Sequence, residues 1–181
     1  LPDGSSYTRC YCEENIFLLA RVFHARDAVR DAWDVFVVFI SNHAKSVALW
    51  NQKAGENLVV WDYHVVLCLR PKSPGEPSLT GAQSWIYDFD TRLPLPSPCP
   101  EYISGTFDLT GGLPSRYHSL FRVVPASVYL DNFASDRSHM VRTVIGIQYN
   151  APVPLYPPLC GPGARERGIE NNLMSAFVDM A

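Results

Sequence analysis

The sequence contains a thiol, an imidazole and a carboxylate that could act together: Cys12, His64 and Asp88. In such a group a thiolate attacks an electrophilic carbon, the imidazole transfers protons, and the carboxylate orients the imidazole. Each residue also has an ordinary structural explanation: an inert buried thiol, a core histidine bonded to a backbone carbonyl, and a turn cap. The elements that carry the three residues decide whether they can meet.

Cys12 begins a predicted helix over residues 12–23. Apolar residues recur there with helical spacing, at Ile16, Leu19, Ala20 and Phe23. Carboxylates in the first turn, Glu13 and Glu14, suit the positive end of the helix dipole. A thiol at a helix N-terminus beside a protonated imidazole has its pKa lowered to roughly 3.5–7.5. We therefore expect Cys12 to ionise readily.

His64 lies in an apolar run over residues 59–69, which is typical of a buried central strand. An unpartnered polar group in a core costs roughly 1–3 kcal/mol, so His64 needs a hydrogen-bond partner. Strand alternation places Trp61 and Tyr63 on the opposite face from His64, in the core, and Asp62 on the same face.

Asp88 lies in the next predicted strand, residues 84–90, after a connection rich in proline and glycine. Strands joined in this way are expected to pair antiparallel. A register that sets His64 opposite Asp88 also sets Val66 opposite Ile86. Directly opposed Cβ atoms lie about 4.5–5.5 Å apart, close enough for an imidazole–carboxylate hydrogen bond.

The remaining pattern predicts an α+β domain in which the apolar face of the 12–23 helix covers this sheet and brings Cys12 to His64. A strand over 35–40 and a second over 46–50 are expected to form a hairpin. The four prolines of residues 93–100 predict a loop. Further predicted elements are a strand over 120–124, a helix from Pro125 to Phe133, a polar loop over 134–140, a proline-rich extended segment over 151–163 and a short helix over 171–180.

Other thiols and imidazoles compete for the catalytic roles. Cys10 precedes the helix and lacks its dipole, and His139 lies in the polar loop without a periodic anchor. The remaining histidines, His24, His43 and His118, are expected at the surface. The residues alone leave the reaction open between protease, transglutaminase, deamidase and thioesterase chemistry.

Composition narrows the class of partner and compartment. The net charge is −3 and no dense Lys/Arg cluster occurs, so we expect neither nucleic acid nor a membrane surface as a partner. The five cysteines form no paired framework or zinc motif, which predicts free thiols in a reducing compartment and no metal or other cofactor. The length suits one catalytic domain over residues 1–181.

Several separate blocks resemble the protein N-terminal glutamine amidohydrolase family, also called the WDYHV-motif family. The resemblance covers about residues 7–140, in the expected order. Its blocks are Cys10-Tyr-Cys-Glu-Glu-Asn-Ile16, Val38-Phe-Ile-Ser-Asn42, Trp61-Asp-Tyr-His-Val-Val66, Ile86-Tyr-Asp-Phe-Asp-Thr91 and Asn132-Phe-Ala-Ser-Asp-Arg-Ser-His-Met140. The catalytic cysteine, histidine and aspartate of the family match Cys12, His64 and Asp88.

The resemblance implies an enzyme that converts an N-terminal glutamine of a protein to glutamate and releases ammonia. It further implies a papain/transglutaminase-like cysteine hydrolase fold, a monomer without a metal, and a cytoplasmic or nuclear place in the N-degron pathway. The alternatives are a module that binds N-terminal residues without chemistry and a papain-like cysteine protease.

An enzyme that selects an N-terminal residue needs a partner for its α-ammonium group. An acidic side chain beside the nucleophile is the simplest choice. The candidates are Glu13, Glu14, Asp62 and Asp90. The polar loop over 134–140 is a candidate for the rim of the same pocket.

Overall fold

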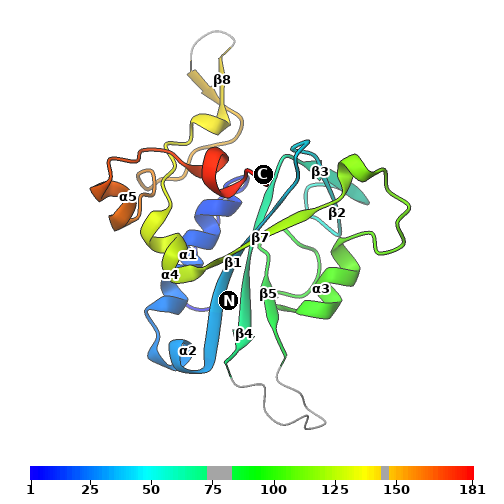
Figure 1. Ribbon diagram of the computed structural model, residues 1–181, viewed down its shortest axis with the longest axis horizontal. Coiled ribbons are helices and arrows are strands. Elements are labelled where there is room, and N and C mark those ends of the chain that lie inside the picture. Colours follow the sequence, from blue (N-terminus) through cyan, green and yellow to red (C-terminus); the bar gives the residue numbers. More distant parts are fainter. Residues whose placement is uncertain (73–82, 144–146) are drawn as a thin grey trace.

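The computed structural model describes residues 1–72, 83–143 and 147–181. Its centre is a five-stranded antiparallel sheet in the order β6-β5-β4-β1-β7. Figure 1 shows α1 and α4 on one side of β1 and β4, and α3 with β2 and β3 on the other. The predicted mixture of helices with a central antiparallel sheet is confirmed.

The helices and strands have the following bounds. The helices are α1 Cys12–His24, α2 Asp27–Ala32, α3 Cys99–Thr106, α4 Ala126–Asn132 and α5 Pro162–Glu166, with shorter helical turns η1 Ser115–Tyr117, η2 Ser138–Met140 and η3 Leu173–Phe177. The strands are β1 Trp33–Ser41, β2 Val47–Trp50, β3 Leu58–Trp61, β4 His64–Pro71, β5 Trp85–Tyr87, β6 Ser97–Pro98, β7 Leu120–Pro125, β8 Val141–Thr143 and β9 Ile147–Tyr149.

The pair β1–β4 forms the backbone of the core. It runs in continuous register from Trp33 opposite Pro71 to Ile40 opposite His64. Valine and phenylalanine dominate β1, and valine and leucine dominate β4; the β-branched and aromatic side chains among them favour the extended backbone. His64 begins β4, whose first four residues are all buried, and enters the core beside Ile40.

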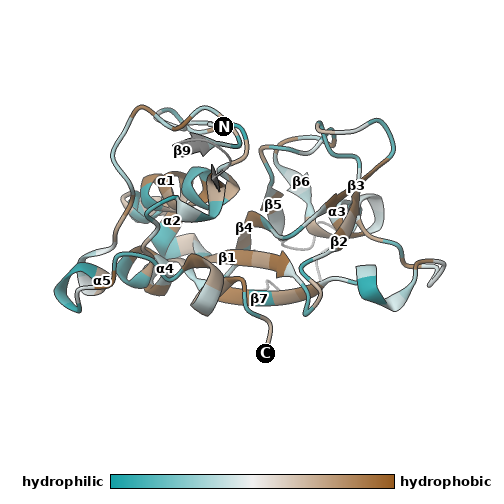
Figure 2. Ribbon diagram, turned by 90° about the horizontal axis from the view of Figure 1, so that it is seen from above, coloured by the Kyte–Doolittle hydropathy of each residue, from teal (hydrophilic) through white to brown (hydrophobic). Residues whose placement is uncertain are grey.

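The apolar face of α1 packs on one side of this pair, and Figure 2 shows α1 beside β1 and β4 from above. Ile16 and Leu19 join Phe39, Val65 and Leu67 in one buried cluster. The predicted helix is confirmed, and its amphipathic spacing explains why it lies here. α1 covers the face of Val65, whereas Val66, on the face of His64, belongs to the second buried cluster. Cys12 therefore approaches His64 at the N-terminal end of β4, where both residues line one cavity.

The predicted strand over residues 59–69 is two strands that belong to different sheets. Within the described ranges β3 pairs only with β2, in a separate two-stranded sheet, and β4 starts after a break at Asp62 and Tyr63. The Ser41 hydroxyl donates to the Asp62 carbonyl at 2.7 Å, and the Asp62 side chain accepts the Tyr63 N–H at 3.0 Å. These hydrogen bonds fix the chain between β3 and β4. The apolar composition of the segment does not predict this interruption.

The predicted hairpin between residues 35–40 and 46–50 is also wrong. β1 pairs with β4 and β7, whereas β2 pairs with β3. The Asn42 side-chain amide donates to the Ser46 carbonyl at 2.7 Å and to two carbonyls next to η1, which turns the chain out of the sheet.

The register between β4 and β5 differs from the prediction by two residues. Cys68 lies opposite Ile86, and β5 ends at Tyr87, so Asp88 follows the strand and does not pair in it. A shift of two preserves which face each side chain occupies, because the side-chain period of a strand is two. His64 and Asp88 therefore still meet. The connection between the two strands lies mostly within residues 73–82, outside the described residues.

The C-terminal part departs from the predicted elements. α3 begins at Cys99, inside the segment predicted as loop, and the predicted helix over 171–180 is a π-helical turn over Leu173–Phe177. The proline-rich segment is irregular up to α5. In the described part of the chain, no helix combines the length and apolar character that a membrane span requires.

Removing core volume from β4 should destabilise the whole domain. Leu67 is fully buried between α1 and the sheet, so Leu67→Ala should lower the free energy of unfolding by about 2–5 kcal/mol in urea denaturation. Leu155→Ala, at a fully exposed side chain, should change it by less than about 0.5 kcal/mol. Equal losses in the two variants would contradict this placement of the core.

Candidate active site

A cavity of about 600 Å³ opens where the N-terminus of α1 meets the break between β3 and β4. Its wall includes Cys12, Trp61, Asp62, His64, Asp90 and His139. The structure thus brings Cys12 and His64 to one cavity, from elements 52 positions apart in the sequence.

His64 and Asp88 form a buried hydrogen-bonded pair beneath this cavity. His64 Nε2 lies 2.8 Å from Asp88 Oδ1, and both residues are about 1% exposed. Tyr102 donates its hydroxyl to Asp88 Oδ2 at 2.8 Å, and the Asp90 N–H donates to Oδ1 at 2.9 Å. Because Asp88 engages Nε2, Nδ1 is the nitrogen that His64 can offer to the cavity.

The pair shifts both protonation equilibria toward the charged forms. Burial by itself lowers the pKa of His64, but the charge and hydrogen bond of Asp88 outweigh it, and the net pKa is raised. Burial likewise raises the pKa of Asp88, but His64 and the N–H of Asp90 outweigh it, and the net pKa is lowered. The Trp61 ring lies 4.7 Å from the His64 ring, so Trp61 contacts the imidazole and does not point away as predicted.

Cys12 is the first residue of α1, whose N-terminus has no side-chain cap. Its Sγ lies 3.7 Å from Glu13 Oε2, and the thiol donates to that carboxylate. Burial, followed by the charges of Glu13 and Asp90, raises the pKa of the Cys12 thiol well above its ordinary value. The predicted low pKa is therefore wrong for the resting protein, because the prediction weighed the helix dipole without the carboxylates that gather around the sulfur.

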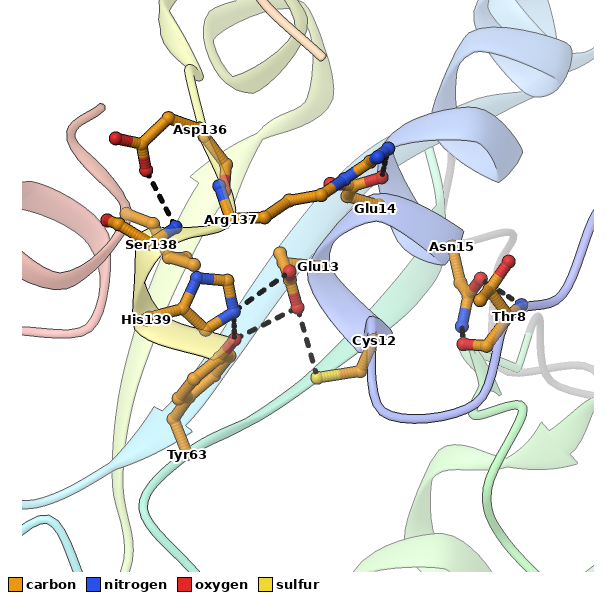
Figure 3. Close-up of polar contacts among 12 residues, drawn as sticks. Thr8, Cys12, Glu13, Glu14, Asn15, Tyr63, Asp136, Arg137, Ser138 and His139 are labelled. Atoms are coloured by element: carbon orange, nitrogen blue, oxygen red, sulfur yellow. Dashed lines mark hydrogen bonds and ion pairs between the residues drawn. The ribbon is translucent and has the colours of Figure 1, made fainter. Parts of the chain in front are cut away.

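A second imidazole–carboxylate contact lies next to the thiol (Figure 3). Tyr63 donates its hydroxyl to Glu13 Oε2 at 3.0 Å and lies 3.2 Å from His139 Nε2. His139 Nε2 also lies 3.4 Å from Glu13 Oε1. Glu13 is fully buried, although sequence reasoning assigned it a helix-dipole role. No periodic signal marked His139, because it enters from the irregular segment after α4.

Glu14 forms a buried ion pair with Arg137. The Arg137 guanidinium donates to both carboxylate oxygens at 2.8 Å, and the two residues are 0% and 5% exposed. The pair joins the loop over 134–140 to α1, as Figure 3 shows. His139 and Met140 of that loop line the cavity.

The four acidic candidates for substrate binding occupy different positions. Glu14 is engaged by Arg137, and Glu13 lies behind the thiol, fully buried. Asp62 and Asp90 line the cavity. Asp62 is exposed, whereas Asp90 is half-buried and accepts the Tyr7 hydroxyl at 2.6 Å.

The competing residues are placed as follows. Cys10 is exposed and lines the cavity, with a left-handed backbone at φ 67°. His24, His43 and His118 are exposed and lie outside this cavity, as predicted. Among the described residues, His64, Asp88 and Asp90 place one potential metal-ligand atom each within 4.8 Å of one another. Two of these three groups already bond to each other, since Asp88 Oδ1 accepts from His64 Nε2, and Asp90 reaches Asp88 only through its backbone N–H.

Comparisons with known proteins point to one family. The model of the family described as N-terminal glutamine amidase matches residues 7–181. Similar proteins named protein N-terminal glutamine amidohydrolase occur in Bos taurus (41% identical over 180 residues, covering 98% of this chain and 79% of the relative) and Homo sapiens (40% over 180 residues, 98% and 80%). One from Arabidopsis thaliana is 37% identical over 180 residues, covering 97% of this chain and 75% of the relative.

The charge of Asp88 should control the pKa of His64. In Asp88→Asn the charge is lost while the burial that lowers the imidazole pKa remains, so that pKa should fall below its ordinary 6.5. In the parent protein it should lie above 6.5. Titration of the His64 ring signals by NMR measures both values. Tyr102→Phe, which removes only one bond to Asp88, should leave the His64 pKa above 6.5.

The same pair sets a window of stability. The pKa of His64 is raised in the folded protein. The stability that His64 contributes to the fold is therefore complete below pH 6.5 and is lost as pH rises through the folded pKa. The pKa of Asp88 is lowered in the folded protein. The stability that Asp88 contributes is therefore present above pH 3.8 and is lost as pH falls through the folded pKa. The stability difference between parent and Asp88→Asn should therefore be greatest between these limits. An unchanged His64 pKa in Asp88→Asn would contradict the conclusion that the charge of Asp88 raises that pKa.

Proposed function

Because the chain belongs to the N-terminal glutamine amidase family, as its sequence blocks predicted, we propose that it hydrolyses the side-chain amide of an N-terminal glutamine. The products are an N-terminal glutamate and ammonia. The observation that carries this proposal is the family match over residues 7–181, together with one cavity that contains Cys12 and His64.

In this proposal Cys12 is the nucleophile, His64 the general base and acid, and Asp88 the group that orients His64. The Cys12 sulfur forms a bond to the side-chain carboxamide carbon while its proton passes to His64 Nδ1. The tetrahedral intermediate then breaks its C–N bond, and His64 returns the proton to the departing nitrogen, which leaves as ammonia. A thioester remains on Cys12. His64 next takes a proton from water, the hydroxide adds to the thioester, and glutamate departs as the thiol is regenerated.

The position of Cys12 supplies a site for the negative charge that develops on the amide oxygen. The N–H groups of the first helical turn have no intrahelical partners, and no side chain caps them. Such groups stabilise an oxyanion without reorganisation during the reaction. The N-terminus of α1 thus carries the nucleophile and also supplies the N–H groups that donate hydrogen bonds to the oxyanion.

The raised thiol pKa affects the order of these events. In the resting protein the proton stays on the Cys12 sulfur and points to Glu13. The His64 imidazole must therefore accept it as the substrate arrives, with Asp88 stabilising the imidazolium that results. Asp88 and Tyr102 keep Nδ1 directed to the cavity throughout.

We further propose that the fold is papain/transglutaminase-like. A cysteine at a helix start, a histidine on a core strand and an aspartate next to the adjacent strand support this. The proposal includes a monomer that acts in the cytoplasm or nucleus, upstream of arginylation of the new N-terminal glutamate in the N-degron pathway.

Incubation with a peptide that begins with glutamine tests the reaction. We expect ammonia release and a peptide mass gain of about 1 Da, because an amide becomes an acid. Cys12→Ala should lower kcat by at least about 10⁴-fold and Asp88→Asn by about 10²–10⁴-fold, as expected for a nucleophile and an orienting group. Cys10→Ala is the matched control and should keep near-parent turnover.

Other outcomes would replace the proposal. Cleaved peptide fragments would indicate a cysteine protease, and cross-linking to an added amine would indicate a transglutaminase. Binding of the peptide without ammonia would indicate a recognition module. Loss of turnover in Cys10→Ala, with activity kept in Cys12→Ala, would move the nucleophile.

A further inference from the structure

A reaction restricted to N-terminal glutamine requires that the enzyme detect the free α-ammonium group. That nitrogen is four bonds from the carboxamide carbon, so the two atoms are at most about 5 Å apart at standard bond lengths. An ammonium group that enters a partly buried cavity loses hydration, which an ionised hydrogen-bond acceptor compensates. The acceptor must therefore lie beside the reacting groups and not at the outer rim.

Asp90 is a carboxylate that lies beside the proposed reacting groups. One of its oxygens lies within 4.8 Å of a ring nitrogen of His64 and of an Asp88 oxygen. It lines the cavity together with Cys12. Its charge also acts on both proposed reacting groups, because it raises the pKa of Cys12 and that of His64.

The backbone and side chain of Asp90 are fixed in advance. Its N–H donates to Asp88 Oδ1 at 2.9 Å, and its carbonyl accepts the Lys53 N–H at 2.7 Å. The Tyr7 hydroxyl donates to Asp90 Oδ1 at 2.6 Å, and the Tyr7 ring stacks on Phe89. The following residue of the lead-in segment, Thr8, is bonded through both its N–H and its carbonyl to the Asn15 side chain of α1.

Asp90 nevertheless has no cation of its own among the described residues. The structure records no ion pair to it, and the nearby Lys53 ammonium is directed to the Phe89 carbonyl at 2.7 Å. Tyr7 engages only Oδ1, and no described residue donates to Oδ2. A half-buried carboxylate held rigidly next to an active site, with one free oxygen and no counter-charge, is suited to receive a cation from the substrate.

The other acidic candidates fit less well. Glu14 is neutralised by Arg137, and Glu13 is fully buried behind the thiol, where it accepts from Tyr63. Asp62 lines the cavity but is exposed, and its Oδ1 accepts the Tyr63 N–H to hold the break before β4.

We propose that Asp90 binds the α-ammonium group of the substrate's first residue through Oδ2, and that Tyr7 holds the carboxylate in place by occupying Oδ1. This inference rests on the proposed function. It assigns Asp90 as the residue that restricts the reaction to N-terminal glutamine, and Tyr7 as a positioning residue contributed by the segment before α1.

A pair of substrates isolates this role from any effect of Asp90 on His64 or Cys12. One peptide begins with a free glutamine, and the other has the same sequence with an acetylated N-terminus. In the parent protein kcat/KM should favour the free peptide by at least about 100-fold, since the ammonium–carboxylate contact is charge-assisted. Asp90→Asn, which still accepts the Tyr7 hydroxyl, should lose most of this preference, mainly through a higher KM for the free peptide.

Asp62→Asn is the matched control, because it removes the other carboxylate of the cavity wall. It should keep the preference of the parent protein within about threefold. Tyr7→Phe should lower the preference less than Asp90→Asn does, because the carboxylate remains but loses its support. Asp90→Asn with an equal loss on both peptides would overturn the proposal, and so would loss of the preference in Asp62→Asn.

A binding measurement separates this proposal from the proposed function. In a Cys12→Ala background, calorimetric titration with the same two peptides needs no turnover. The Kd of the free peptide should rise by about 100-fold on adding Asp90→Asn, while the Kd of the acetylated peptide should stay unchanged. Absence of ammonia release by the parent protein would overturn the hydrolase function, whereas equal affinity for the two peptides would overturn the role of Asp90.

Discussion

The buried hydrogen bond between His64 Nε2 and Asp88 Oδ1 is the interaction on which the rest of the site depends. Two ionisable groups that are about 1% exposed are costly to bury unless each finds a partner. Much of the local structure serves this requirement. The break before β4 starts the strand at His64, the end of β5 frees Asp88 from pairing, and α3 brings Tyr102 to the second carboxylate oxygen. The result is an imidazole with one nitrogen fixed and the other directed to the cavity.

The thiol of Cys12 bonds to Glu13, which pairs with His139, and it lines the same cavity as His64. Burial raises the pKa of the thiol, and the carboxylates around the sulfur raise it further, so the helix dipole alone does not produce a resting thiolate. In the proposed reaction this negative field has a use. It attracts a substrate that carries a positive α-ammonium group, and it repels the product, whose side chain has become a carboxylate. Selection of the substrate and release of the product then follow from the same set of charges.

Local features were predictable from the sequence, and long-range ones were not. The helix that begins at Cys12 was predicted because its apolar spacing is visible within a dozen residues. The partner of β1 was predicted wrongly, because hydrogen bonds from Asn42 turn the chain out of the sheet and nothing in the strand composition reveals them. The His64–Asp88 contact survived a register error of two residues because faces repeat every second residue.

Other site residues had no local signal at all. Tyr102 follows Asp88 by fourteen positions, in a helix that begins inside a segment predicted as loop. Arg137 and His139 reach α1 from more than 120 residues away in the sequence, so only the folded chain shows that they bond to Glu14 and Glu13. The low pKa expected for Cys12 failed for the same reason. Burial raises the pKa of the thiol, and so do the charges of Glu13, Asp90 and Asp62, three of the four acidic candidates for substrate binding.

Capture of the covalent intermediate tests the central claim, that Cys12 attacks the glutamine amide with His64 as its proton partner. The protein is mixed with a glutamine-initiated peptide, quenched in acid within a single turnover, and analysed by intact mass and by mapping of the proteolytic fragments. The account predicts an adduct equal to the peptide mass less ammonia, located on Cys12. In His64→Ala the same adduct should form more slowly, because the thiol proton has lost its acceptor. An adduct on Cys10, or rapid ammonia release with no adduct on any cysteine under these conditions, would contradict it.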